Sequence, residues 1–130
     1  MLKEATSILI LGADRTKAGR IRSLLTKNIA QATVSQAPGD KSSLDAIRQN
    51  HPDLVLLNLD GSDGNGLGLI KRIVGEFSLP VIVIMDAGAT DRQLIAALEA
   101  GACDYAFEPV MAEELTENIY RALREERDVV

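Results

Sequence analysis

The chain of 130 residues has no tryptophan, one cysteine, two tyrosines and two phenylalanines, so its core must be mainly aliphatic. The single Cys103 excludes an internal disulfide and a zinc site built on several thiolates, and it suits a reducing cytoplasm. No apolar run approaches the ~20 residues of a membrane-spanning helix. Lysine and arginine number 14 against 19 aspartates and glutamates. This balance argues against direct binding to nucleic acid, because clustered basic side chains are needed to neutralise phosphates.

What the sequence does contain is an alternation of short apolar runs and segments of helical periodicity. The runs at 8–11, 54–57 and 81–85 are continuously apolar, which suits strands that are covered on both faces. Weaker strand segments lie at 32–36 and 105–107. Five strands alternating with five helices predict a parallel sheet with helices on both sides. Ligands of such sheets bind beyond the carboxyl ends of the strands.

Helix boundaries are marked by particular residues. Asp14 is expected to cap the helix after the first strand, in which Lys17 and other basic residues separate the apolar positions. Thr90 followed by Gln93 predicts a capping box for a later helix, and Gly101 is expected to end that helix.

Three further points concern one helix and two single residues. The apolar residues of the helix that ends at Gly101 are Leu94, Ile95 and Leu98. Cys103 stands at the entry to the fifth strand, where a small buried thiol is common. His51 is expected at the surface near a helix end, because no nucleophile pattern surrounds it.

Several segments, in this order and spacing, resemble the response-regulator receiver family over essentially the whole chain. They are residues 51–59 (HPDLVLLNL), Gly66-Leu67, residues 80–84 (PVIVI), residues 101–105 (GACDY) and Glu108-Pro109. The resemblance implies a flavodoxin-like, doubly wound (βα)5 three-layer sandwich with strand order 2-1-3-4-5. It also implies that residues 1–130 form a single receiver-like domain, of the kind that stands at the N-terminal end of a longer cytoplasmic regulator.

The chemistry of the family enters through the same resemblance. Receivers accept a phosphoryl group on an aspartate that ends the third strand. Mg²⁺ held by an acidic pair, a hydroxyl after the fourth strand and a lysine after the fifth strand stabilise it. The corresponding positions here are Gly12 and Ala13, Asn58, Met85 or Asp86 according to the direction of counting, and Glu108. None carries the family's group, so we expect a pseudo-receiver that is not an enzyme, takes no cofactor and has lost the Mg²⁺ site.

Other family features are retained. Glu108-Pro109 is a candidate cis peptide. Tyr105 stands at the position of the family's switch aromatic. In the family, the fourth helix, fifth strand and fifth helix carry dimerisation and output contacts, which implies a protein partner or a homodimer, and no membrane contact. The corresponding surface would draw on residues around Ala97, Ala100, Tyr105, Tyr120 and Arg121.

Alternatives to this interpretation remain. Asn58 either keeps the site in one fixed state or has drifted after its chemistry was lost. Asp14, Asp60, Asp86 and Glu108 form either an acidic cluster for a hard cation or a helix cap with solvated loop charges, the second being favoured. Asp60 is also a weak candidate as a substitute phosphoacceptor. A small-ligand or metal-binding domain of the same fold is the alternative function.

Overall fold

The computed structural model describes residues 5–40, 42–59 and 65–128. Within these ranges, strands and helices alternate from end to end, as the sequence predicts. The strands are β1 (Thr6–Leu11), β2 (Ala32–Ala37), β3 (Leu54–Leu59), β4 (Val81–Met85) and β5 (Asp104–Phe107). The helices are α1 (Arg15–Asn28), α2 (Ser42–Asn50), α3 (Asn65–Phe77), α4 (Asp91–Ala100) and α5 (Ala112–Asp128).

The strands form one parallel sheet in the order β2-β1-β3-β4-β5, which confirms the predicted topology. Strand order reverses at β1, because β2 pairs on one side of it and β3 on the other. In such sheets the crevice beyond the carboxyl ends of the strands is the usual place for function.

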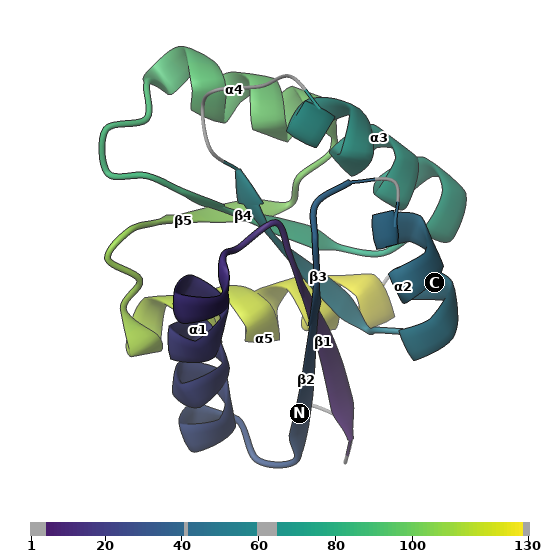
Figure 1. The fold of residues 1–130 in the computed structure, drawn as a ribbon, viewed down its shortest axis with the longest axis vertical. Helices are drawn as coiled ribbons and strands as arrows, with labels where there is room; N and C mark the ends of the chain where they lie inside the picture. Colours follow the sequence, from purple (N-terminus) through teal and green to yellow (C-terminus); the bar gives the residue numbers. More distant parts are fainter. Residues whose placement is uncertain (1–4, 41, 60–64, 129–130) are drawn as a thin grey trace.

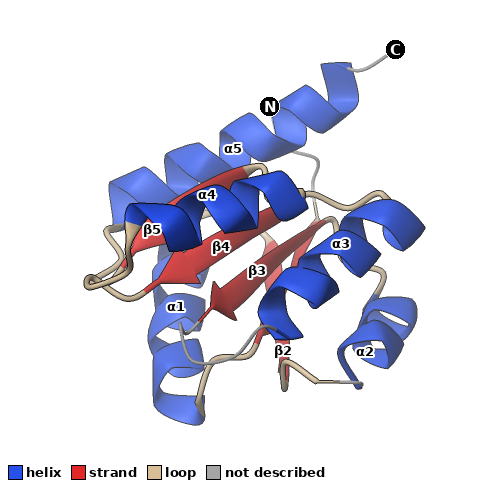
Figure 2. Cartoon of the chain, turned by 90° about the horizontal axis from the view of Figure 1, so that it is seen from above, coloured by secondary structure: helices blue, strands red, loops and turns tan. Residues whose placement is uncertain are grey.

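Helices cover both faces of the sheet (Figures 1 and 2). Ile8 and Ile10 of β1 pack in a cluster with α1 and α5, whereas Leu9 and Leu11 pack in a second cluster with α2, α3 and α4. The side chains of a strand alternate between the two faces, so a central strand needs apolar residues at every position. This requirement explains the continuous apolar runs of β1, β3 and β4.

Helix ends follow the predicted caps. Asp14 accepts a hydrogen bond from the Lys17 amide at 2.8 Å and caps α1. Thr90 and Gln93 form the reciprocal bonds of a capping box at α4. Gly101 ends α4 with φ +123°, a backbone conformation that side-chain-bearing residues rarely adopt.

The exposed side of α4 differs from the expected partner surface. Ala97 and Ala100 are buried against the sheet, while Ile95 and Leu98 are 53% and 39% exposed. Small alanine side chains let the helix approach the sheet closely, and residues three apart share one side of a helix. The expected partner surface therefore cannot include Ala97 or Ala100, and Ile95 and Leu98 present apolar surface instead.

Two expectations about single residues have opposite outcomes. His51 is exposed after the end of α2, as predicted. Cys103 is exposed as well, so its predicted burial is wrong. The neighbouring Ala102 is buried against the core instead. The backbone amide of Cys103 donates a hydrogen bond to the carbonyl oxygen of Val81 at 2.9 Å, so Cys103 contacts β4 through its backbone.

Candidate functional site

The carboxyl ends of β1, β3, β4 and β5 bring most of the predicted site residues to one edge of the sheet. Because β1 and β3 pair in register as far as residues 11 and 57, Gly12 lies beside Asn58. The amide of Glu108 donates to the carbonyl oxygen of Met85 at 2.8 Å, which carries the β4–β5 pairing beyond the end of β5. Asp60 lies outside the residues that the structure describes.

The half-buried amide of Asn58 is bound at both ends by other parts of the chain. Its Oδ1 atom accepts a hydrogen bond from Nζ of Lys17 at 3.3 Å. Its Nδ2 atom donates to the carbonyl oxygen of Gly12 at 3.4 Å. This orientation matches donors with acceptors, because an ammonium only donates and a backbone carbonyl only accepts.

Lys17 is the functional candidate that sequence analysis missed. It had been counted among the polar positions of α1, yet only 19% of its side chain is exposed. The Asp14 cap places Lys17 in the first turn of α1, directly beyond the end of β1. The side chain can therefore cross the edge of the sheet, and it reaches residues that follow three other strands or lie near their ends.

Two carboxylates share the ammonium of Lys17 with Asn58. Nζ lies 3.7 Å from Oε1 of Glu108 and 3.9 Å from Oδ1 of Asp86. Asp86 is well hydrated, with 60% of its side chain exposed, so water screens its interaction. Glu108 is only 19% exposed. Glu108 was expected to be a solvated loop charge, and that expectation is wrong.

The profile of the response regulator receiver domain family matches residues 8–120. The chain belongs to this family. The match extends from β1 into α5 and so includes every residue of the candidate site.

Curated relatives of this receiver domain include the transcriptional regulatory protein CseB of Streptomyces avermitilis, 36% identical over 70% of this chain and 38% of the relative. Protein-glutamate methylesterase/protein-glutamine glutaminase 3 of Burkholderia thailandensis is 27% identical over 89% of this chain and 34% of the relative. A putative response regulator from Chloroflexus aurantiacus superposes with a TM-score of 0.78 at 29% identity, covering 92% and 98% of the two chains. The chain spans about a fifth to a half of the length of the curated relatives it matches.

The residues that the resemblance assigns to the metal-binding positions do not fit Mg²⁺. Gly12 and Ala13 have no side-chain oxygen, and the carboxylate of Asp14 caps α1. The described residues contain no group of three or more histidine, cysteine or acidic side chains placed to hold a metal ion. The two nearby carboxylates face the Lys17 ammonium. A hard cation needs several oxygen ligands around an open centre.

Met85 and Asp86, the two candidates for the hydroxyl position, have different environments. Met85 is the last residue of β4, and its side chain is buried in the core cluster that packs on α2, α3 and α4. Asp86 is the first residue after the strand and reaches Lys17. Asp86 therefore occupies the edge of the site, and neither residue supplies a hydroxyl.

The positive charge of the site lies on α1 and a negative charge follows β5, which is the reverse of the expected family arrangement. Glu108, which the resemblance assigns to the lysine position after β5, is followed by Pro109 through the predicted cis peptide. The cation of the site comes from α1 instead, as Lys17. The neutral Asn58 of β3, which the resemblance assigns to the acceptor position, accepts a hydrogen bond from this lysine.

Tyr105, which the resemblance assigns to the switch position, is half-buried. Its ring lies edge-on to Phe107 with centroids 5.6 Å apart. Its carbonyl oxygen accepts a hydrogen bond from the buried Asn118 of α5 at 3.0 Å. On the same side of α5, Arg121 pairs with Asp104 of β5 at 2.9 Å. Tyr120 precedes Arg121 by one residue, which places it about 100° around the helix, and the residue is 38% exposed.

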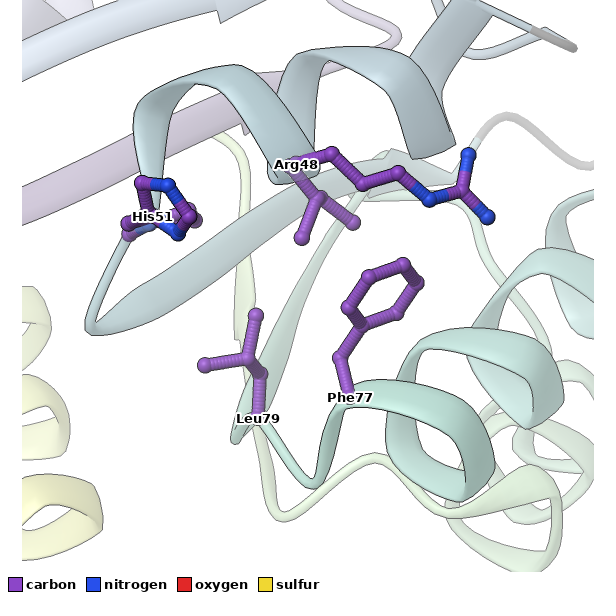
Figure 3. A pocket seen from close by; sticks show the side chains of 6 residues that line it. Arg48, His51, Phe77 and Leu79 are labelled. Carbon is purple, nitrogen blue, oxygen red and sulfur yellow. The ribbon is translucent and has the colours of Figure 1, made fainter.

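A separate pocket of about 320 Å³ lies among residues of α2, α3 and the segments that follow them, and Figure 3 shows its lining side chains. The guanidinium of Arg48 stands over the ring of Phe77, 5.5 Å from its centroid. The pocket is lined by Ile47, Arg48, His51, Pro52, Phe77 and Leu79. Because these residues precede or flank the amino ends of β3 and β4, the pocket is distinct from the candidate site.

No helix among the described residues is long and apolar enough to span a membrane.

Proposed function

We propose that this receiver domain signals without being phosphorylated and acts by binding protein, with no enzymatic activity of its own. The observation that carries the proposal is the amide of Asn58, whose two polar atoms are bound by Lys17 and Gly12. An uncharged amide is a poor nucleophile, and here it serves as a structural connector between α1, β1 and β3. We further propose that residues 1–130 act as one domain of a cytoplasmic regulator.

The physical argument is that phosphoryl transfer would fail at several independent points. Transfer needs an anionic acceptor and a cation that neutralises the charge growing on the phosphoryl oxygens. Asn58 offers no anion, and Gly12 and Ala13 offer no metal ligand. Glu108 places negative charge where the family carries a lysine. A single reversion therefore restores one requirement and leaves the others missing.

Mass spectrometry of Asn58→Asp tests this argument. The variant is incubated with acetyl phosphate and Mg²⁺ beside a receiver that has the complete set of site residues. We expect the complete receiver to gain one phosphoryl group and both the wild-type chain and Asn58→Asp to gain none. A stable phosphoryl adduct on the wild-type chain or on Asn58→Asp would contradict the proposal.

The binding surface that we propose consists of Ile95, Leu98 and the Asp104–Arg121 pair, here called the α4–β5 face. Ile95 and Leu98 are large apolar residues in contact with water, which is unusual side by side on one helix. Arg92 precedes Ile95 by three residues and Glu99 follows it by four, so both signs of charge flank the apolar centre.

We propose a second copy of this chain as the occupant of the α4–β5 face. A two-fold dimer brings a surface against itself, so the surface must complement itself. An apolar centre flanked by arginine and glutamate meets this condition, because each charge can face its opposite in the partner. Tyr105 packs against the core cluster that includes Ala97 and Ala100 of α4, so its replacement should also weaken association.

Sedimentation equilibrium of paired variants tests the surface. Ile95→Ser/Leu98→Ser removes the apolar centre and should convert a concentration-dependent dimer into a monomer. Met111→Ser is the matched control, because Met111 is 61% exposed yet belongs to the connection that precedes α5. A wild-type chain that stays monomeric at all concentrations, or an equal effect of Met111→Ser, would count against this face.

A further inference from the structure

We propose that Lys17 is the permanent counter-cation of the receiver site and that its ammonium keeps divalent ions away from Glu108 and Asp86. The inference deepens the proposed function, since it supplies a reason why the site works without metal. It rests on the geometry around Nζ of Lys17, with Asn58 at 3.3 Å, Glu108 at 3.7 Å and Asp86 at 3.9 Å.

Of the two carboxylates beside Lys17, Glu108 has the greater need of a cation. Its Oε1 atom is buried and has no hydrogen-bond partner among the described residues. A carboxylate withdrawn from water is costly unless an opposite charge or a donor compensates it. Lys17 is the cation that the structure places beside this atom. The Lys17–Glu108 pair should therefore contribute more than an exposed ion pair, which is worth little.

Lys17 is also held in place from its own helix. The Asp14 carboxylate binds its amide, and the next residue, Ala18, is fully buried against the core. The base of the side chain is therefore fixed at the start of α1. Its ammonium extends over the ends of β1 and β3 toward the residues that follow β4 and β5. One side chain thus connects α1 to three other segments of the edge.

A divalent ion would have to compete with this ammonium for the same oxygens. Mg²⁺ binds oxygens at about 2.0–2.1 Å and is repelled by a positive charge at contact distance. With Lys17 present, the carboxylates already have their cation. Without Lys17, two carboxylates and the Asn58 oxygen remain together at the edge, and a divalent ion with retained waters becomes the natural replacement.

Thermal and urea unfolding of four proteins test this inference. They are the wild-type chain, Lys17→Met, Glu108→Gln and Lys17→Met/Glu108→Gln, and Lys17→Arg serves as the control that keeps the charge. Each is measured with Mg²⁺ or Ca²⁺ and with Na⁺ at matched ionic strength. If Lys17→Met fails to fold, Lys17→Gln replaces it in the same series.

We expect Lys17→Met to lower the folding equilibrium constant about tenfold, because it leaves Glu108 without its cation, and to lower it much less in the Glu108→Gln background. Divalent ions should raise the melting temperature of Lys17→Met and leave the wild-type chain, Lys17→Arg and the double variant unchanged.

Stabilisation of the wild-type chain by divalent ions would overturn the inference. So would equal effects of Lys17→Met in both backgrounds, or a Lys17→Met variant that does not respond to divalent ions. None of these outcomes alters the acetyl phosphate or sedimentation results, so a failure here is distinguishable from a failure of the proposed function.

Discussion

A Cβ atom placed on Gly12 would lie 3.0 Å from the carbonyl oxygen of Asn58. Gly12 also has φ +79°, in the region that favours glycine. The position that the resemblance assigns to the first residue of the acidic pair is thus occupied by a residue whose backbone tolerates no side chain without adjustment. An acidic residue could return to this position only if the chain between β1 and α1 changed its path.

We predict opposite effects for two glycine-to-alanine substitutions in neighbouring segments. Gly12→Ala should lower the free energy of unfolding by about 1–2 kcal/mol, because it forces a side chain into a left-handed conformation. Gly19→Ala, inside α1 with open space around its position, should raise it by about 0.5–1 kcal/mol. Urea unfolding measures both, and a Gly12→Ala variant as stable as the wild-type chain would show that the turn adapts freely.

The buried amide of Asn118 should matter more than an exposed one with a similar bond. Asn118→Ala removes the donor to the Tyr105 carbonyl and should cost about 1–2 kcal/mol of unfolding free energy. Asn28→Ala removes a bond to the Leu24 carbonyl at the exposed end of α1 and should cost far less. Equal losses in urea unfolding would mean that burial does not set the strength of this contact between α5 and β5.

The capping box of α4 gives a third stability prediction. Thr90→Ala should lower the free energy of unfolding by about 1 kcal/mol, because it leaves the Gln93 amide without its acceptor. Thr26→Ala is the control, since Thr26 lies inside α1 with an exposed side chain, where alanine is the better helix former. It should be neutral or slightly stabilising, and calorimetry that ranks the two variants the other way round would contradict the assignment.

Asp40 provides a prediction about pH. Hydrogen bonds from the hydroxyl and then the amide of Ser42 hold the pKa of Asp40 below its ordinary value of 3.8. A carboxyl group whose pKa is lower in the folded chain stabilises the fold above pH 3.8 and loses that contribution as the pH falls through the folded value. An NMR titration should show this lowered pKa, and Ser42→Ala should move it back up toward 3.8. An unchanged pKa in Ser42→Ala would remove the assigned cause.

The caps could be predicted because they depend on local patterns, and the parallel sheet because short apolar runs alternate with helical segments. The strand order followed from the resemblance to the receiver family. The role of Lys17 could not, because its spacing in α1 is that of any solvent-exposed lysine and its partners lie 41 or more positions away. The side of α4 that is buried could also not be predicted from the sequence. Ala97 and Ile95 are both apolar, and only the distance between helix and sheet selects the smaller side chain for burial.

The exposed apolar pair Ile95 and Leu98 requires no chemical trigger to be present at the surface. Under the proposed function, a receiver that displays the α4–β5 face at all times responds to mass action alone. The strength of its signal would then follow the concentration of the protein in the cell.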